Sequence, residues 1–438
     1  MGIILLGTIA IAMFLLLLAI GVHISTNFFI IGFLSIMALL GIKPVISLLG
    51  QSMYHTIASP GFAALPLFIL MGSFAARGGF ARKAYKCLYV LTSKLPGSLA
   101  VATSYGCALF GAICGSSLAT AAVFGKVALP EMQKYKYDKS FSLGTIAASG
   151  TFACMIPPSY GLVLYAIFTG ESIGKLFLAG IIPGLITATV YSLSIIFRVK
   201  LNPKLAPKVV VESFSIKDKI KAITDTWSII LLIIIVLGGI YSGFLTPNEA
   251  AAMGAFAALI IGIFQGELNN LDVVKECIRG TAKISSMIFI IIAGALFFSR
   301  FIAITRFSDV LAYSLLGMRR EFILWGICVL WFFMGMIMEG GGIKALLLPI
   351  FFPIIISSGY NGIWFGIVTQ KLGEIAAVTP PVGLNVFALK GVAGEGTSLE
   401  EIFRGIWPFV LCDIIVLILL LVPFPIISLY LPNLLLGK

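Results

Sequence analysis

The chain has 438 residues, of which 60% are hydrophobic and 11% are charged. Soluble domains carry about 25% charged residues, so this composition excludes a soluble enzyme or binding module. The net charge of +12 would suit nucleic-acid binding, but the basic residues cluster in short connectors between apolar stretches, as in membrane proteins. Seven scattered cysteines and two isolated histidines show no metal-site or catalytic spacing, and we expect neither a transition metal nor an enzyme.

Apolar stretches of about 20 residues, each long enough to cross a bilayer, recur along the chain. The first, 3–22, lacks the basic region and cleavage site of a signal peptide, so we expect a retained transmembrane helix. Two charged amphipathic stretches, 79–94 and 268–283, are predicted to lie along the membrane interface. Membrane helices are predicted, in chain order, at 2–22, 27–42, 61–76, 140–168, 176–198, 226–243, 247–265, 284–299, 361–391 and 405–435.

Two segments, 97–133 and 321–357, are too long to cross a membrane once. Each has a break at its middle, formed by Cys114-Gly115-Ser116-Ser117 in the first and by Glu339-Gly340-Gly341-Gly342 in the second. We interpret both as re-entrant hairpins. A non-helical tip at membrane depth is tolerated only inside protein or beside a water-filled cavity.

The second half of the chain repeats landmarks of the first half. The matching positions are Pro130 and Pro353, Pro157-Pro158 and Pro380-Pro381, Gly115 and Gly340, Gly180 and Gly405, and Arg77 and Arg300. Duplicated spans interrupted by Gly and Pro are typical of secondary transporters. The predicted fold class is an all-α polytopic membrane protein with inverted repeats, two re-entrant helical hairpins and two broken transmembrane helices.

This pattern predicts five parts. They are scaffold helices in 1–60, a first repeat in 61–200, a cytoplasmic linker in 201–222, scaffold helices and an interfacial arm in 223–283, and a second repeat in 284–438. With most of the 30 Lys and Arg residues placed in the cytoplasm, both termini are predicted to be periplasmic.

The two broken helices carry the first candidate site. Residues 149–159 include Pro157-Pro158, and residues 379–385 include Pro380-Pro381. Consecutive prolines remove two backbone donors, so each helix must break near mid-depth. A break frees carbonyl oxygens, which suit Na⁺, and exposes a helix N-terminus, which suits a carboxylate. A simple proline kink is the alternative for one such helix, and its recurrence in the second repeat weakens that alternative.

The hairpin tips carry the second candidate site. Ser116 and Ser117 supply hydroxyl oxygens, although small residues here are also compatible with close helix packing. Glu339 is an acid at membrane depth, where it either serves function or bonds to the glycine backbone. Lys126 is expected to snorkel to the surface. Lys344 and Lys371 could each attract an anion or snorkel, and Glu374 could pair with Lys371 at helical spacing.

At these motifs the sequence resembles the large membrane subunit of TRAP (tripartite ATP-independent periplasmic) transporters, that is, a DctM-like chain of the ion-transporter superfamily. The resemblance covers residues 1–435 and rests on these motifs: Gly115-Ser-Ser-Leu-Ala-Thr, Leu129-Pro-Glu-Met, Ile156-Pro-Pro-Ser, Thr246-Pro-Asn-Glu-Ala-Ala-Ala, Gly335-Met-Ile-Met-Glu-Gly and Thr379-Pro-Pro-Val-Gly-Leu-Asn. Glu339 stands where Asp is commoner in the family, and Lys344 where an apolar residue is commoner.

The resemblance implies an elevator-type carrier of the bacterial inner membrane, coupled to Na⁺ at two or more sites. It implies two partners, a small four-helix membrane subunit on a separate chain and a periplasmic substrate-binding protein. The implied Na⁺-binding residues are Gly115, Ser116, Ser117, Thr151, Pro157, Glu339, Gly340, Gly341, Thr379, Pro380 and Gly383. The implied substrate-binding residues are Ser116, Ser117, Pro158, Ser159, Asn385, Arg300 and Lys344.

We therefore expect Na⁺-driven uptake of an organic acid, with C4-dicarboxylates, sugar acids and sialic acid all open as substrates. The rival within transporters is a stand-alone Na⁺/carboxylate symporter that needs neither partner. A membrane-embedded enzyme would need clustered His, Asp or Ser-base groups, and a passive channel would need a continuous polar pore.

Overall fold

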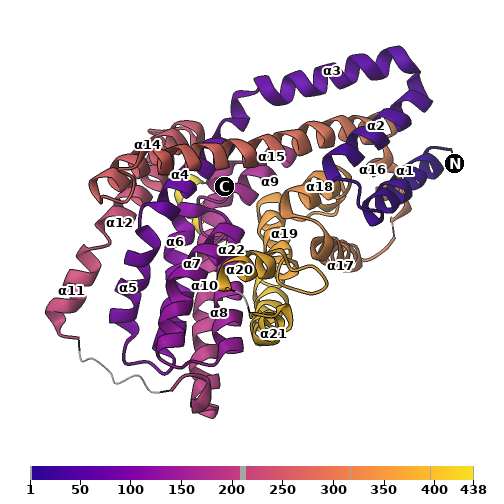
Figure 1. The fold of residues 1–438 in the computed structure, drawn as a ribbon. Helices are drawn as coiled ribbons and strands as arrows, with labels where there is room; N and C mark the ends of the chain where they lie inside the picture. Colours follow the sequence, from indigo (N-terminus) through magenta and orange to yellow (C-terminus); the bar gives the residue numbers. More distant parts are fainter. Residues whose placement is uncertain (1, 208–213, 316, 395, 438) are drawn as a thin grey trace.

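The computed structural model describes residues 2–207, 214–315, 317–394 and 396–437, and every regular element in these ranges is helical. The centre of the predicted linker, 208–213, lies outside the described residues. Helices α5 to α8 and α10 run side by side, and the long helix α15 and helix α3 run across one end of them (Figure 1). The all-helical fold class predicted from the sequence is confirmed.

The first half of the chain supplies the first repeat and the helices before it. These elements are α1 (Gly2–Ala19), α2 (Ile24–Leu40), α3 (Ile42–Ala58), η1 (Pro60–Phe62), α4 (Ala64–Arg77), α5 (Phe80–Thr92), α6 (Ser98–Cys114), α7 (Ser117–Lys134), α8 (Lys139–Phe152), α9 (Tyr160–Thr169) and α10 (Ile173–Leu201).

The second half supplies the connecting helices and the second repeat. These elements are η2 (Pro203–Leu205), α11 (Ile216–Thr224), α12 (Trp227–Ile233), η3 (Ile234–Gly238), α13 (Gly239–Tyr241), α14 (Pro247–Phe264), α15 (Leu271–Thr305), α16 (Phe307–Ser314), α17 (Arg320–Ile337), α18 (Gly340–Ser357), α19 (Gly362–Ala376), α20 (Leu384–Ala393), α21 (Leu399–Ile415), η4 (Val416–Leu421) and α22 (Ile426–Leu436).

The two predicted hairpins are present as α6–α7 and α17–α18. In the first, α6 ends at Gly115, whose φ of 63° lies in the left-handed region that glycine tolerates. Ser116 then caps α7 by accepting a hydrogen bond from the Ala119 amide. The second tip has the same length, with Met338 following α17 and Glu339 capping α18. The chain thus reverses within two residues at each tip.

The two predicted broken helices are also present. The first consists of α8 and α9, separated by residues 153–159, and the second of α19 and α20, separated by residues 377–383. The Pro157-Pro158 and Pro380-Pro381 peptide bonds are both cis. Residues 151–159 are buried throughout, whereas Pro381 in the second break is exposed. The two breaks therefore differ in how far the surrounding protein covers them.

Each repeat packs its hairpin against the broken helix of the other repeat. Arm α7 lies against α20, and arm α18 lies against α9, so the same kind of contact occurs twice. Helices α8 and α21 approach closely because Gly144 faces Gly405, where a side chain on either residue would meet backbone. Because each hairpin packs on the broken helix of the other repeat, both tips and both breaks lie close together in the bundle.

Two sequence predictions about helix boundaries were wrong, and one helix was not predicted. The predicted interfacial stretch 268–283 and helix 284–299 form one continuous helix, α15, because no Gly-Pro break separates them. The predicted helix 405–435 ends in η4 and restarts as α22, because Pro423 and Pro425 cannot donate to helical hydrogen bonds. Residues 43–60, left unassigned between the predicted helices 27–42 and 61–76, form most of α3, which packs on α2 and α15.

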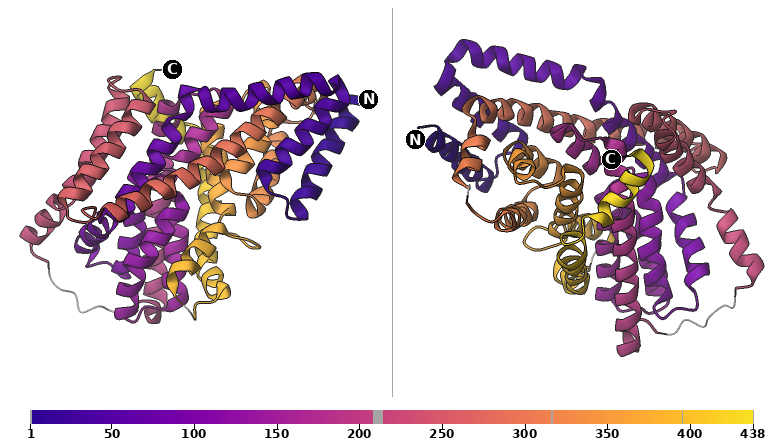
Figure 2. Two further views of the ribbon diagram at one scale, coloured as in Figure 1. Left: turned by 45° about the horizontal axis from the view of Figure 1, so that its top comes forward. Right: turned by 180° about the vertical axis from the view of Figure 1, so that it is seen from behind.

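Among the described residues, seven helices are long and apolar enough to cross a membrane, or eight if the bent pair α11 with α12–α13 counts as one span. Both termini lie along the upper edge in the left view of Figure 2, and the end of α10 lies at the opposite edge. The described residues therefore hold enough long apolar helices for a multi-pass membrane protein. The division into scaffold and moving parts stays a prediction.

Candidate functional site

A small polar cavity lies where the two tips and the two breaks meet. Its wall includes the first residues of four different helices. These residues are Ser117 and Leu118 of α7, Tyr160 and Gly161 of α9, Gly340 of α18, and Leu384 and Asn385 of α20. The two half-helices and the two hairpin arms that begin at the breaks and tips therefore all start at this cavity.

The starts of three of these helices are capped by side chains. Ser116 caps α7 and Ser159 caps α9, each accepting from a backbone amide at 3.4 Å. The Glu339 carboxylate caps α18 by accepting from the Gly341 amide at 3.0 Å. Each helix start still leaves amide groups without intrahelical partners and carries the positive end of the helix dipole. Four such ends at one cavity favour an anion.

Four buried polar side chains complete the cavity wall. They are Lys344 of α18, Gln370 and Glu374 of α19, and Asn385 of α20. Gln370 donates from Nε2 to Oε1 of Glu374 at 2.6 Å. The Gln370 amide fits because Gly161 has no side chain, and a Cβ there would lie 2.6 Å from its Oε1. Because Glu339 also lines it, the cavity combines one ammonium group, two carboxylates and two carboxamides.

The Tyr160 hydroxyl links the first break to the second tip. It donates a hydrogen bond of 2.7 Å to Oε1 of Glu339. Both residues line the small cavity and also a second, larger one. Their hydrogen bond therefore lies in the wall between the two cavities.

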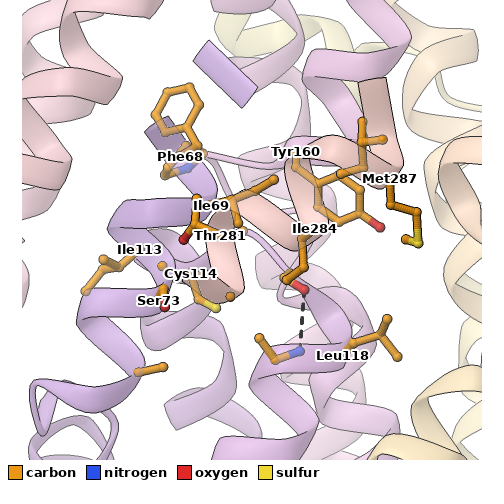
Figure 3. A pocket seen from close by; sticks show the side chains of 18 of the residues that line it. Phe68, Ile69, Ser73, Ile113, Cys114, Leu118, Tyr160, Thr281, Ile284 and Met287 are labelled. Atoms are coloured by element: carbon orange, nitrogen blue, oxygen red, sulfur yellow. Dashed lines mark hydrogen bonds between the residues drawn. The ribbon is translucent and has the colours of Figure 1, made fainter. Parts of the chain in front are cut away.

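The larger cavity, of about 450 Å³, is mostly apolar. It lies between α4, the first tip, the first break and α15, and Figure 3 shows Ile69, Ile113, Ile284 and Met287 gathered around it with Tyr160. Ser73 and Thr281 add hydroxyl groups to its wall. An apolar chamber next to a polar one suits an amphiphilic small molecule better than a bare ion.

The structure brings together most of the site residues predicted from the sequence. Gly115, Ser116 and Pro158 line the larger cavity, Ser117, Gly340, Lys344 and Asn385 line the smaller, and Glu339 lines both. Buried Pro157 and half-buried Pro380 lie within the two breaks. Gly341 donates to Glu339, and Gly383 starts α20 with a φ of 63°.

Four predicted residues have other contacts. Thr151 donates to the Ala148 carbonyl at 2.6 Å, and Thr379 donates to the Ile375 carbonyl at 2.7 Å. The Ser159 hydroxyl oxygen caps α9 by accepting a hydrogen bond from the Leu162 amide. Arg300 points to α3, where its Nε donates to Ser52 at 3.2 Å, and it lines neither cavity.

Lys371 forms its ion pair with Asp413 and not with Glu374, the partner that helical spacing made possible. The Lys371 ammonium forms an ion pair with Asp413 of α21 and donates to the Thr187 hydroxyl at 3.1 Å. The Tyr191 hydroxyl donates to the other Asp413 oxygen at 2.6 Å. Lys371 and Asp413 are completely buried, and the cluster ties α10, α19 and α21 together. Lys126 is exposed, consistent with snorkelling.

The sequence prediction missed Tyr160, Gln370 and Asp413. Gln370 and Glu374 lie one turn apart on the same broken helix, and that spacing of polar residues in an apolar span was a usable signal. Asp413 is an isolated acid in an apolar helix, which is by itself an indication of function or of a buried partner.

A family model described as "Tripartite ATP-independent periplasmic transporter, DctM component" matches residues 11–426. The chain is 33% identical to the isethionate TRAP transporter permease protein DctMQ of Oleidesulfovibrio alaskensis, covering 93% of this chain and 63% of that protein. It is also 33% identical to the C4-dicarboxylate TRAP transporter large permease protein DctM of Pseudomonas aeruginosa, covering 88% of this chain and 89% of that one.

The fold resembles the crystal structure of the Alcanivorax borkumensis YdaH transporter, with a TM-score of 0.64 at 14% identity, covering 89% of this chain and 90% of that chain. Paired hairpins and broken helices around a buried polar cavity define a secondary transporter rather than an enzyme. The chain belongs to the DctM component family of tripartite ATP-independent periplasmic transporters. It is thus a transporter permease of the bacterial inner-membrane type.

Proposed function

We propose that this chain is the carrier subunit for Na⁺-coupled uptake of a small organic acid. The observation that carries the proposal is the small cavity at which four helices begin and to which Lys344 contributes its ammonium group. Helix N-termini and a buried cation both stabilise an anion. An acid group bound here would lie between the two repeats, where inverted-repeat carriers bind their substrates.

Na⁺ coupling is supported by the chemistry of the two breaks. The first tip with residues 151–157 and the second tip with residues 379–383 offer hydroxyl and carbonyl oxygens, which hard cations prefer. The Ser149 hydroxyl, just before the first break, is buried without a hydrogen-bond partner in the described structure. We assign one Na⁺ site to each tip and break, in keeping with the repeat.

The family description, one component of a tripartite system, supports two partners. These are a small membrane subunit and a periplasmic protein that delivers the substrate, and with them we propose an elevator movement of the hairpins and broken helices. The DctMQ relative is longer than this chain, which spans 63% of it. A stand-alone symporter, the rival interpretation, has less support because the matching family is defined as one component of three.

The substrate class rests on the cavity and on the relatives. The two relatives carry the names isethionate and C4-dicarboxylate, which are both small organic anions. The partial positive charge at the helix N-termini suits either a sulfonate or a carboxylate.

The test is uptake into proteoliposomes that contain this chain with its small subunit, supplied with the binding protein and a radiolabelled acid. Uptake is expected to require an inward Na⁺ gradient and to use more than one Na⁺ per substrate. Replacing Na⁺ by K⁺ or by a proton gradient is expected to abolish accumulation. Equal accumulation without Na⁺ would contradict the coupling, and uptake without the binding protein would favour the stand-alone symporter.

A further inference from the structure

The small cavity contains polar groups that the protein itself leaves without partners. Both carboxamide atoms of Asn385, Oε1 of Gln370 and Oε2 of Glu374 are buried and make no hydrogen bond within the described residues. No ion pair within 4.0 Å joins the buried Lys344 ammonium to a described carboxylate. Buried polar groups almost always have partners, so these atoms indicate a ligand.

The groups at the cavity have opposite requirements. The Lys344 ammonium, which interacts electrostatically with Glu374 and Glu339, and the four helix starts favour an anion, whereas the free oxygen of Glu374 requires a hydrogen-bond donor or a cation. Gln370 offers a free acceptor oxygen beside Glu374, because its amide nitrogen already donates to Glu374. Asn385 can both donate and accept. A ligand that satisfies all of them must carry an acid group and a donor group close together.

The size of the cavity restricts what enters it. Its volume of about 30 Å³ restricts it to the polar end of a ligand and excludes a whole organic acid. Leu118, Tyr160 and Glu339 line both cavities, so the remainder of a ligand bound in the small cavity would have to extend past these side chains into the larger one. The wall of that larger cavity is mostly apolar, which suits a short hydrocarbon body.

We propose that the polar cavity selects acids that carry a hydroxyl or ammonium group on the carbon next to the acid group, with Lys344 binding the acid and Glu374 the donor. Glu374 is then a specificity residue that rejects a second carboxylate through repulsion between like charges. This inference rests on the proposed function, because it concerns the substrate of that same cavity.

The experiment measures direct binding to the purified chain with its small subunit, in NaCl, by the concentration-dependent rise in its unfolding temperature. The probes are matched three-carbon acids: lactate and alanine with a donor, propionate without one, and malonate with a second carboxylate. Lactate or alanine is expected to bind about tenfold or more tightly than propionate, which corresponds to one hydrogen bond to a charged group. Malonate is expected to bind most weakly.

Two variants test the proposed roles of Glu374 and Lys344 separately. Glu374→Gln keeps the shape and an acceptor oxygen but removes the charge, and it is expected to improve malonate binding relative to lactate about tenfold. Lys344→Met is expected to abolish stabilisation by every probe. Lys126→Met, which removes an exposed lysine from the first hairpin, is the control and is expected to bind like the wild type.

Tighter binding of malonate than of lactate to the wild type overturns the inference, and so does a wild type that no probe stabilises. If the ratio of lactate affinity to malonate affinity is the same in Glu374→Gln as in the wild type, Glu374 is not the specificity residue. If Glu374→Gln does not fold, the order in which the wild type binds the four probes decides. If Na⁺-driven uptake is observed while malonate is preferred, only this inference fails. If uptake is independent of Na⁺ while the binding order holds, only the coupling in the proposed function fails.

Discussion

Tyr160 and Glu339 are 179 positions apart in the chain, yet the tyrosine hydroxyl donates to the glutamate carboxylate at 2.7 Å. Tyr160 is the first residue of α9 and Glu339 the residue that caps α18, so the bond joins the first broken helix to the second hairpin. Because both residues line both cavities, a movement of one tip relative to the other must change the wall between the cavities.

Replacing Tyr160 by Phe tests this link. The variant removes one hydrogen bond to a charged group, worth about 1.5–3 kcal/mol, and leaves the ring in place. We expect a roughly ten- to hundredfold rise in apparent KM for uptake in proteoliposomes. Tyr105→Phe is the control, since the Tyr105 hydroxyl contacts Thr189 at an exposed position. An unchanged KM in both variants would show that the link does not contribute to transport.

Ser117→Ala tests the first tip as a ligand-binding element. The change removes one hydroxyl oxygen from the small cavity while the helix start is retained. Loss of one ligand to a charged species should weaken apparent affinity for Na⁺ or substrate by about 1.5–3 kcal/mol, a ten- to hundredfold effect. Ser93→Ala, a buried serine that donates to the Val90 carbonyl in α5, serves as the control. Equal apparent affinities for Na⁺ and substrate in the two variants would show that the first tip contributes only to packing.

Breaking the Lys371–Asp413 ion pair should destabilise the fold. Lys371→Met leaves a buried carboxylate without its cation, which typically costs about 3–5 kcal/mol. We expect a large fall in the unfolding temperature in detergent and a partial recovery when Asp413→Leu is added. Arg77→Met, which removes the exposed ion pair with Glu276, should lower the unfolding temperature far less. If the double variant is no more stable than the single one, the charges do not act as a pair.

Gly405→Ala should disrupt the contact between α8 and α21. A Cβ at Gly405 would overlap the Ser140 carbonyl and lie 3.0 Å from the Gly144 Cα, so backbone must move. Overpacking of this kind costs about 1–3 kcal/mol or more. Size-exclusion chromatography should show less folded protein. Gly326→Ala is the control, because nothing lies within 4 Å of its added Cβ.

Single cysteines in a background without the seven native ones test the inverted topology. Exposed positions after the two hairpins are Lys134 at the end of α7 and Ser357 at the end of α18. An impermeant thiol reagent applied from the periplasmic side should label Cys at 357 but not at 134. Labelling of both from one face would refute the inversion of the repeats.

Much of the architecture follows from the sequence by itself. The helix breaks at 153–159 and 377–383 were predictable, because paired prolines remove backbone donors wherever they occur. The hairpin tips at Gly115 and Gly340 were predictable as well, because a span of nearly 40 apolar residues must reverse. These are local properties, set by a residue and its immediate neighbours.

The partners of the buried charges were decided only by the tertiary structure. Helical spacing allowed Lys371 to pair with Glu374, yet Lys371 pairs with Asp413 on α21, and Glu374 faces the cavity. Arg300 was a candidate for the substrate, but its side chain contacts Ser52 on α3. Helical spacing shows which side chains share a face of one helix. The packing of the helices then decides what that face meets, because a buried charge must be satisfied by whatever group the fold brings within reach.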